Sequence, residues 1–323
     1  MGVEPSDTEQ RAAWLASKHA GTPSQQHFDS LGRTVYAIAD NGVAGKYATR
    51  SVLDIENNLR EVIDARGNVV MEYKYDTVSH QLYQKSMDAG ERFVFNDVLN
   101  KQVFTWDSRS HRFKTEYDLL HRPLKQWLKE NVNDANEEKL IHFSIYGESQ
   151  LNDKQFNLRG KLFQSFDQSG MVETSQYDFK NNVKHNSRQL AIEYKQVADW
   201  NVVNPMLLLN TEAFAGSSLF DALSRATELQ LPDGSKIHPS YNEAGLLEQV
   251  NVFVQNQNQN IFFVQNIDYN AKAQRERILY GNNTSAKYEY DEKTYHLTRL
   301  LTTRNNGADI LQDLNYTFDP VAN

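Results

Sequence analysis

The nine histidines are the residues with the greatest capacity for acid–base or metal chemistry in this 323-residue sequence. None of them stands in the His-x-x-x-His or His-Glu-x-x-His spacing that places two imidazoles on one face of a helix. Four of them, His80, His111, His121 and His185, fall in or beside expected turns, where an exposed polar residue is usual. The sequence therefore predicts no metal site. The other five histidines are His19, His27, His142, His238 and His296.

The remaining reactive groups show no catalytic arrangement either. Glu137 and Glu138 are neighbours at an expected loop tip and should point apart, and the oxygen-rich segment 129–139 around them lacks the spacing of an EF-hand loop. There is no glycine-rich phosphate loop and no Gly-x-Ser-x-Gly elbow. The chain has no cysteine, which excludes disulfides, zinc–thiolate sites and thiol nucleophiles. We predict no catalytic, cofactor-binding or metal-binding residue, no cofactor, and a protein that is not an enzyme.

Charge and hydropathy narrow the classes of partner. The 34 Lys and Arg residues against 42 Asp and Glu residues give a net charge of -8 without a basic block. This balance disfavours nucleic acid and anionic membranes as partners. No apolar run approaches the ~20 residues that a membrane helix requires, and the N-terminal segment has no signal-peptide core. We therefore expect neither nucleic-acid binding nor a membrane span.

A repeated unit organises the stretch from Ala65 to Asp118, where aspartates recur every 9 to 12 positions. Between them apolar and charged residues alternate, as in Val69, Met71, Tyr73 and Tyr75 with Glu72 and Lys74. Alternation in short runs, divided at even spacing by turn residues, is typical of consecutive antiparallel strands. The array of hairpins, rather than any one residue, is then the expected functional object. The aspartates are Asp64, Asp76, Asp88, Asp97, Asp107 and Asp118.

Each aspartate is expected to begin a four-residue turn. Its carboxylate can accept a hydrogen bond from a backbone N–H two residues on, and glycine in the fourth place can adopt a positive φ. Asp29–Gly32 and Asp64–Gly67 follow this pattern. Other residues stand in the fourth place elsewhere, and we expect some of those turns to be distorted or of another type. These residues are Asn57, Ser79, Asn100, Ser110, His121, Asn181 and Ser224.

Large aromatic residues follow the strands, and two interpretations of them stand side by side. They could stack sugars or an unfolded chain on an exposed face. They could instead join each hairpin to the next, in which case each contributes about 1.5–3 kcal/mol when buried. The sequence favours the second interpretation. The residues are Tyr73, Tyr75, Phe93, Phe95, Phe104, Trp106, Phe113 and Tyr117.

Two helices are expected outside the strands. Ser6 and Glu9 form a capping box for a first helix, and Asn186–Gln196 has the pattern of a second. The predicted organisation is an N-terminal helix and lead-in over 1–22 and a first hairpin array over 23–185. A helical interruption over 186–210 and a second array over 211–323 follow. The second array is expected to be incomplete, because the segment from Tyr316 to Asp319 begins a further unit. We therefore expect a segment of something longer.

These units resemble the YD repeats of Rhs proteins, and the chain is most similar to the middle-to-late region of the B subunit of insecticidal Tc toxin complexes. The matching segments span most of the chain. They are FDSLGRT (28–34), KYATR (46–50), REVIDARGNVV (60–70), AGERF (89–93), YD (117–118), RPL (122–124), NLRGK (157–161), FDQSGMVETSQYDFKNN (166–182), SRQLAIEY (187–194), YNEAGLLEQV (241–250), NIDYNAKAQRERILYGN (266–282) and LTRLLTTRN (297–305).

The resemblance implies an all-β fold of curved antiparallel hairpins that forms part of a hollow spiral shell. In that family the B and C subunits together enclose the unfolded toxic tail of the C subunit. Implied partners are therefore a C-type Rhs toxin subunit and its unfolded cargo. The pore-forming A subunit would be reached only through parts that this sequence does not contain. The autoprotease motif and the toxic tail are also absent, and glycines of the pattern are replaced at Asn181 and Ala322.

The sequence thus favours a structural, non-enzymatic shell segment of a secreted toxin complex that lacks a classical signal peptide and resides in the cytoplasm before release. The alternative is a YD-repeat surface adhesion or carbohydrate-binding module. A truncated remnant is a further alternative that the sequence leaves open. Uncapped repeat arrays seek partners at their edges, so we expect the isolated chain to self-associate or to be marginally stable.

Overall fold

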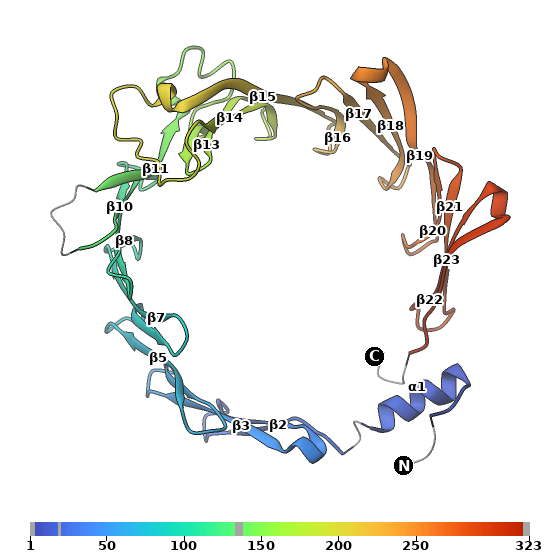
Figure 1. Cartoon of the computed structure of the whole chain (residues 1–323), viewed down its shortest axis with the longest axis horizontal. Helices are drawn as coiled ribbons and strands as arrows, with labels where there is room; N and C mark the ends of the chain where they lie inside the picture. Colours follow the sequence, from blue (N-terminus) through green and yellow to red (C-terminus); the bar gives the residue numbers. More distant parts are fainter. Residues whose placement is uncertain (1–3, 19–20, 133–137, 319–323) are drawn as a thin grey trace. The chain divides into compact units, whose positions relative to one another are not determined.

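The computed structural model describes residues 4–18, 21–132 and 138–318, which form an all-β protein with one α-helix (Figure 1). Two compact units are present. Unit 1 comprises Met1–Ser144, Phe166–Gln168 and Glu193–Pro205, and unit 2 comprises Ile145–Ser165, Ser169–Ile192 and Met206–Asn323. The expected further repeat at Asp319 and the replaced position Ala322 lie outside the described residues, as do His19 and Glu137.

The elements alternate strand and turn along the chain. They are α1 (Thr8–Ser17), β1 (Gln25–Phe28), β2 (Thr34–Asp40), η1 (Gly42–Ala44), β3 (Lys46–Leu53), β4 (Leu59–Ile63), β5 (Val69–Tyr75), β6 (Gln81–Ser86), β7 (Gly90–Asn96), β8 (Gln102–Asp107), β9 (Arg112–Tyr117), β10 (Pro123–Lys129), β11 (Lys139–Tyr146), η2 (Gly147–Ser149), β12 (Leu162–Asp167), β13 (Gly170–Tyr177), β14 (Val183–Ala191), η3 (Pro205–Leu208), β15 (Leu209–Phe220), β16 (Ala226–Gln230), β17 (Lys236–Tyr241), β18 (Leu247–Val254), η4 (Gln255–Gln257), β19 (Gln259–Tyr269), β20 (Arg275–Tyr280), β21 (Thr284–Tyr290), β22 (Leu297–Arg304), η5 (Asn305–Gly307) and β23 (Asp309–Asn315).

In unit 1 every strand from β1 to β10 pairs antiparallel with the next one in the chain, and β10 pairs with β11. Cross-strand partners include Glu72 with Lys85 and Phe93 with Trp106. The strands therefore form one layer, in which each hairpin shares a strand with the next. The predicted antiparallel hairpin array is confirmed.

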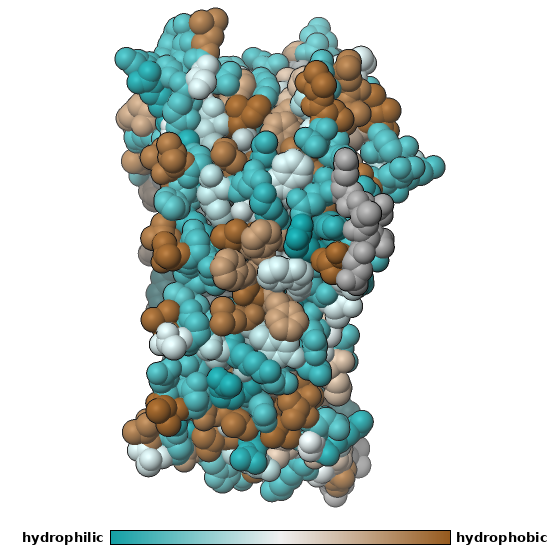
Figure 2. Space-filling view, turned by 90° about the vertical axis from the view of Figure 1, so that its left-hand side faces the viewer, coloured by the Kyte–Doolittle hydropathy of each residue, from teal (hydrophilic) through white to brown (hydrophobic). Residues whose placement is uncertain are grey.

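Unit 2 repeats this arrangement. Strands β13 to β23 pair antiparallel in chain order. Its hydrophobic cluster is small: Ile267, Ile278 and Ala286 are buried, and Tyr269 and Tyr280 are among the half-buried residues around them. A single layer has no second sheet to pack against, so most large apolar side chains are only half covered. In the face shown in Figure 2, hydrophobic residues lie scattered among polar ones.

The N-terminal helix α1 is confirmed, but its cap lies one residue later than expected. The side chain of Asp7, rather than Ser6, accepts a hydrogen bond from the backbone N–H of Gln10 at 2.9 Å. Aspartate is as good an N-cap as serine, so the two neighbours compete for this position. No helix in the described ranges is both long and apolar enough to cross a membrane.

The expected internal helix at Asn186–Gln196 is wrong. Most of this segment is β14, where Arg188 is paired with Val172 of β13 on one side and with Phe214 of β15 on the other. Leu190 and Tyr194, which a helix would place on one face, are exposed. Two flanking ladders satisfy the backbone of β14, and this tertiary pairing overrides a weak local pattern. The division of the chain at 186–210 stays a prediction.

The stretch Glu193–Pro205, where helix was expected, is an irregular segment that packs on β11. The backbone N–H of Leu140 donates to Asp199 Oδ1 at 2.9 Å, and the N–H of Trp200 donates to the carbonyl oxygen of Leu140 at 2.9 Å. The Trp200 side chain is 2% exposed and meets the ring of Phe166 edge-on, with 5.3 Å between centroids. This segment therefore forms hydrogen bonds with backbone groups of β11 that would face solvent if this edge of the strand were open.

Candidate functional site

The turn at Asp64 shows how one carboxylate organises each hairpin. Oδ1 accepts from the backbone N–H of Arg66 at 2.9 Å and from that of Asn68 at 2.8 Å, while Oδ2 accepts from Asn68 Nδ2 at 3.1 Å. The backbone closes the loop, because the N–H of Gly67 donates to the Asp64 carbonyl at 3.0 Å. The turn-forming role expected of the aspartates is thus confirmed at Asp64, but it is wrong for Asp88, where Ser86 Oγ accepts the turn hydrogen bonds instead.

The residue four places after the aspartate is part of this device, and the sequence analysis missed it. Its side chain donates to Oδ2 in turn after turn, with Nε of arginine, Nδ2 of asparagine or Nδ1 of histidine. The recurrence of Arg, Asn or His at this place was the available signal. The pairs are Asp29–Arg33, Asp54–Asn58, Asp64–Asn68, Asp76–His80, Asp107–His111, Asp118–Arg122, Asp178–Asn182 and Asp221–Arg225.

The expectation that turns without glycine would be distorted is wrong. Ser79, Ser110 and His121 adopt φ values of 65°, 64° and 57°, in the left-handed region where glycine is otherwise favoured. The same backbone bonds close these turns as close the glycine turns. The hydrogen bonds to the aspartate offset the local cost of a positive φ, which is about 1–2 kcal/mol for a residue with a Cβ.

These contacts shift the titration of the turn carboxylates. The backbone N–H of Asn68, followed by its side-chain amide, lowers the pKa of Asp64, although burial opposes them. At Asp221 the backbone N–H of Arg225 lowers the pKa most, burial raises it in part, and the Arg225 side chain lowers it further. Hydrogen bonds to the ionised form thus keep the turns charged and bonded at neutral pH.

The tyrosine that precedes a turn ties it to an earlier turn at the same edge of the sheet. In unit 2 the hydroxyl of Tyr241 donates to the carbonyl of Ala226 at 3.1 Å, and that of Tyr290 donates to Arg275 at 2.8 Å. Alternate turns of an antiparallel meander lie at one edge, so each bond spans a whole hairpin. The same bond joins Tyr75 to Leu59, Tyr117 to Gln102, Tyr177 to Leu162 and Tyr269 to Leu247.

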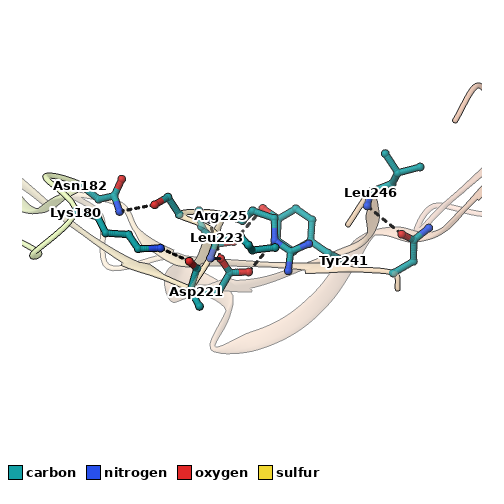
Figure 3. A network of polar contacts seen from close by, with 11 residues as sticks. Lys180, Asn182, Asp221, Leu223, Arg225, Tyr241 and Leu246 are labelled. Carbon is teal, nitrogen blue, oxygen red and sulfur yellow. Dashed lines mark hydrogen bonds and ion pairs between the residues drawn. The ribbon is translucent and has the colours of Figure 1, made fainter. Parts of the chain in front are cut away.

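A second set of bonds runs in the opposite direction, from an earlier turn to the next turn at the same edge. Figure 3 shows the set between the turns at Asp178 and Asp221: Asn182 Nδ2 donates to Ser224 Oγ at 3.1 Å, and Lys180 Nζ donates to the carbonyl of Ala222. In unit 1, Arg33 Nη1 donates to the Asp54 carbonyl at 2.9 Å. The turns at Asn270 and Asp291 are linked in both directions, because Gln274 Nε2 donates to the Tyr295 carbonyl at 3.0 Å and the Tyr290 hydroxyl donates to the Arg275 carbonyl.

Three of the histidines weighed in the sequence lie beside turn aspartates. His80 and His111 contact their turn aspartates, His121 lies 4.0 Å from Asp97, and burial lowers the pKa of His142. Across residues 4–18, 21–132 and 138–318, no three His, Asp or Glu side chains are grouped so that they could hold a metal ion.

The aromatic residues divide between the two interpretations. Tyr75 and Tyr117 link turns, and burial raises the pKa of both hydroxyls. Phe104 and Trp106 stack with 5.7 Å between ring centroids. Phe95, by contrast, is 57% exposed. A cavity of about 470 Å³ in unit 1 is lined by Phe93, Trp106 and Phe113 and by the amides Gln81, Gln84 and Gln102.

Comparison with known proteins gives relatives along nearly the whole chain, although no family model matches. The chain is 26% identical over 337 residues to the protein "Toxin subunit YenC2" of Yersinia entomophaga, which covers 94% of this chain and 34% of the relative. It is 24% identical over 328 residues to "Toxin subunit YenC1" of the same organism, with the same coverage. The chain thus spans about a third of the length of these relatives.

Solved structures show the same fold. The crystal structure of TcdB2-TccC3 superposes with a TM-score of 0.87 at 23% identity, covering 98% of this chain and 16% of that one. The structure of the Photorhabdus luminescens Tc holotoxin pore superposes with a TM-score of 0.86 at 22% identity, covering 96% and 16%. The similarity extends through β14 and the irregular segment that follows it, because almost the whole chain is covered.

Proposed function

The chain is a YD-repeat, Rhs-type relative of the Tc toxin subunits, and from this premise we propose that it is a wall segment of a shell that encloses an unfolded toxic polypeptide. The observation that carries the proposal is the linking of turns at the sheet edge. Tyr75, Tyr241 and Tyr290 each tie one hairpin to the next-but-one turn. Bonds of this kind hold neighbouring hairpins together along the edge of the ribbon.

A single-layer sheet suits a barrier. Its backbone groups are paired strand to strand, so the layer can separate two compartments without a thick core. Large side chains that are half covered on such a layer leave apolar surface for an unfolded chain to lie against. The fold shared with TcdB2-TccC3 and with the Tc holotoxin supports this interpretation.

We assign the chain to a B-type component, following the segments listed above from FDSLGRT to LTRLLTTRN. Because the relatives are named YenC2 and YenC1, the alternative assignment is a C-type component of the same shell. The proposed partners are a C-type Rhs subunit and its unfolded cargo, while the pore-forming A subunit would be reached through other parts. The role is structural rather than catalytic. Neither docking, self-cleavage nor toxicity is assigned to this segment.

The proposed place of action is a secreted toxin complex that forms in the cytoplasm and is released without a classical signal peptide. A test of this is fractionation of the producing cells, with the chain followed by antibody. We expect it in the culture fluid together with the C-type subunit. Retention in the cytoplasm under conditions that release the other subunits would contradict the assignment.

The enclosure itself is tested by co-expression of the chain with an Rhs-type C subunit of the same genome. The C-terminal tail of that subunit should survive a trypsin time course in the complex and be cut rapidly when expressed alone. A matched complex that carries Tyr75→Phe and Tyr117→Phe tests the turn links. If the tail is digested at the same rate with and without the B-type protein, the proposal fails.

The cavity lined by Phe93, Trp106 and Phe113 favours a second candidate function, carbohydrate binding. Aromatic faces beside side-chain amides are a combination that suits sugar rings. Trp106→Ala tests it better than Tyr75→Ala, because the Tyr75 hydroxyl bonds to the Leu59 carbonyl and its loss would disturb the fold. Glycan-array binding that Trp106→Ala abolishes, with an unchanged circular dichroism spectrum, would favour this candidate over the shell.

A further inference from the structure

One edge of the unit 1 ribbon carries a row of aliphatic side chains at its turn tips. Ile55, Val98 and Leu119 are 95%, 98% and 100% exposed, and each is the residue directly after a turn aspartate. Four more aliphatics, on the turns at Asp29, Asp76, Asp97 and Asp118, are over half exposed. We call the seven the apolar rim: Leu31, Ile55, Val78, Val98, Leu99, Leu119 and Leu120.

These seven residues lie at one edge because of the strand pairing. The turns follow β1, β3, β5, β7 and β9, and alternate turns of an antiparallel meander share an edge. The bonds from Arg33 to Asp54, Tyr75 to Leu59 and Tyr117 to Gln102 join neighbouring turns of this row. Two strand spacings separate successive tips, so the row repeats every ~10 Å.

The opposite edge is different. Its turns carry Ala65 and Arg66, or Ser108 and Arg109, at their exposed tips, and among the described residues of these turns the exposed large apolar ones are Val43 and Met87. Figure 2 shows hydrophobic residues recurring at intervals along the left-hand rim of the displayed face. Leu31, Val78, Leu99 and Leu120 donate only their backbone N–H groups to the turn aspartates, so the aliphatic side chains at the tips have no role in these bonds.

The size and repeat of the rim indicate what would cover it. Seven aliphatic side chains of roughly 100 Å² each give about 700 Å², near the ~800 Å² that each partner buries in a standard protein interface. Turn tips that repeat every ~10 Å are separated by notches with the same repeat. Only a row of side chains with the same spacing fits into these notches. The net charge of -8 disfavours an anionic membrane as the cover.

We propose that the apolar rim docks against the turn rim of a second YD-repeat array, and that a second copy of this chain supplies the matching rim. The two rows interdigitate, with the tips of one copy in the notches of the other. The association uses turn tips rather than the backbone edges of β1 and β23. It is therefore independent of whether the ribbon encloses a cargo.

Two matched substitutions test the rim in solution. Val98→Glu places a charge on the rim, and Val43→Glu places the same charge on a fully exposed valine of the opposite edge. We expect the wild-type chain to form dimers at about 10 µM in sedimentation equilibrium, and Val98→Glu to weaken dimerisation at least ~10-fold, since an unpaired charge would be buried. Val43→Glu should leave it unchanged. Both side chains are exposed in the free chain, so unaltered thermal unfolding of the free monomers checks the fold.

The absence of cysteine from the sequence allows a second, direct test. Leu119→Cys should form cross-linked dimers with a short bifunctional maleimide, and Val43→Cys should not. A chain that stays monomeric at about 100 µM would overturn the proposal. Dimers that survive Val98→Glu, or that cross-link through Val43→Cys, would overturn it in favour of another interface. Co-sedimentation of the monomer with phosphatidylcholine–phosphatidylglycerol vesicles, lost in Val98→Glu, would assign the rim to membranes instead.

Discussion

The hydroxyl of Tyr241 donates a hydrogen bond to the carbonyl oxygen of Ala226, fifteen residues earlier, at 3.1 Å. Tyr241 precedes the turn at Asn242, and Ala226 follows the turn at Asp221, where Arg225 also lies 4.4 Å from the Tyr241 ring centroid. One tyrosine thus joins two turns of unit 2 through a hydroxyl and a ring. The tyrosine that precedes a turn therefore joins one hairpin to another.

Replacing this tyrosine by phenylalanine isolates the hydroxyl. Tyr241→Phe should lower the free energy of unfolding by about 0.5–1.5 kcal/mol, the net contribution of one buried hydrogen bond. Tyr288→Phe is the control, because no hydrogen bond of the Tyr288 hydroxyl to another described residue is present. Urea unfolding measures both. Equal effects of the two substitutions would show that the bond to Ala226 contributes nothing.

The turn aspartates should make the fold sensitive to acid. The folded pKa of Asp64 lies below its unfolded value, so the folded state binds fewer protons. The stability it contributes is present above the unfolded pKa and is lost as the pH falls through the folded pKa, that is, below about pH 4. Unfolding free energies measured from pH 7 to pH 3 should fall less steeply in Asp64→Asn.

The control for this pH series is Asp88→Asn. The Asp88 carboxylate accepts no turn hydrogen bond in the described part of the chain, in contrast to Asp64, which accepts three. Its substitution should leave the pH profile parallel to that of the wild type. A wild-type stability that stays constant down to pH 3 would refute the role given to the turn carboxylates.

Serine at a positive φ offers a stabilising substitution. Ser79 has φ of 65°, where glycine avoids a Cβ clash that costs ~1–2 kcal/mol, against an entropic cost of glycine of roughly 0.5–1 kcal/mol. Ser79→Gly should therefore raise the melting temperature or leave it unchanged. Ser51→Gly, in the middle of β3, should lower it, because strand backbone gains nothing from glycine. A destabilising Ser79→Gly would show that Ser79 is not strained.

Trp200 should hold the segment Glu193–Pro205 on β11. Trp200→Ala removes a side chain that is 2% exposed and its contact with Phe166, so we expect a loss of about 3–5 kcal/mol in the stability of this region. Hydrogen exchange of the Leu140 and Trp200 amides should accelerate. Trp14→Ala, in the half-exposed N-terminal helix, should leave both amides unchanged. Protection that persists in Trp200→Ala would contradict this role.

The sequence predicts the ribbon well because strand alternation and turn residues are local signals. The strands around Tyr73–Tyr75 and the turn at Asp64 are where the pattern places them. The helix predicted at 186–196 is wrong because its pattern is short and because β14 pairs on one side with β13 and on the other with β15, which lies beyond the irregular segment Glu193–Pro205. A local sequence pattern does not show which strand edges pair with each other.

The linking contacts were only partly accessible from the sequence. The Arg, Asn or His four places after each aspartate recurs, and could have been found by aligning the turns at Asp29, Asp76 and Asp178. The bonds of Tyr117 to Gln102 and of Tyr290 to Arg275 need the three-dimensional fact that alternate turns share an edge. The apolar rim needs it too, since Ile55 and Leu119 look like isolated loop residues in the sequence.

Hydrogen exchange of the C-subunit tail in the complex with the full-length B-type protein tests the enclosure of an unfolded chain most directly. Amides of the tail should exchange at the rate of an unfolded chain while the tail stays uncut by trypsin, and the turn amides of Arg66 and Asn68 should be protected. Tail amides protected like those of a folded domain, or a tail that trypsin cuts freely in the complex, would contradict the account.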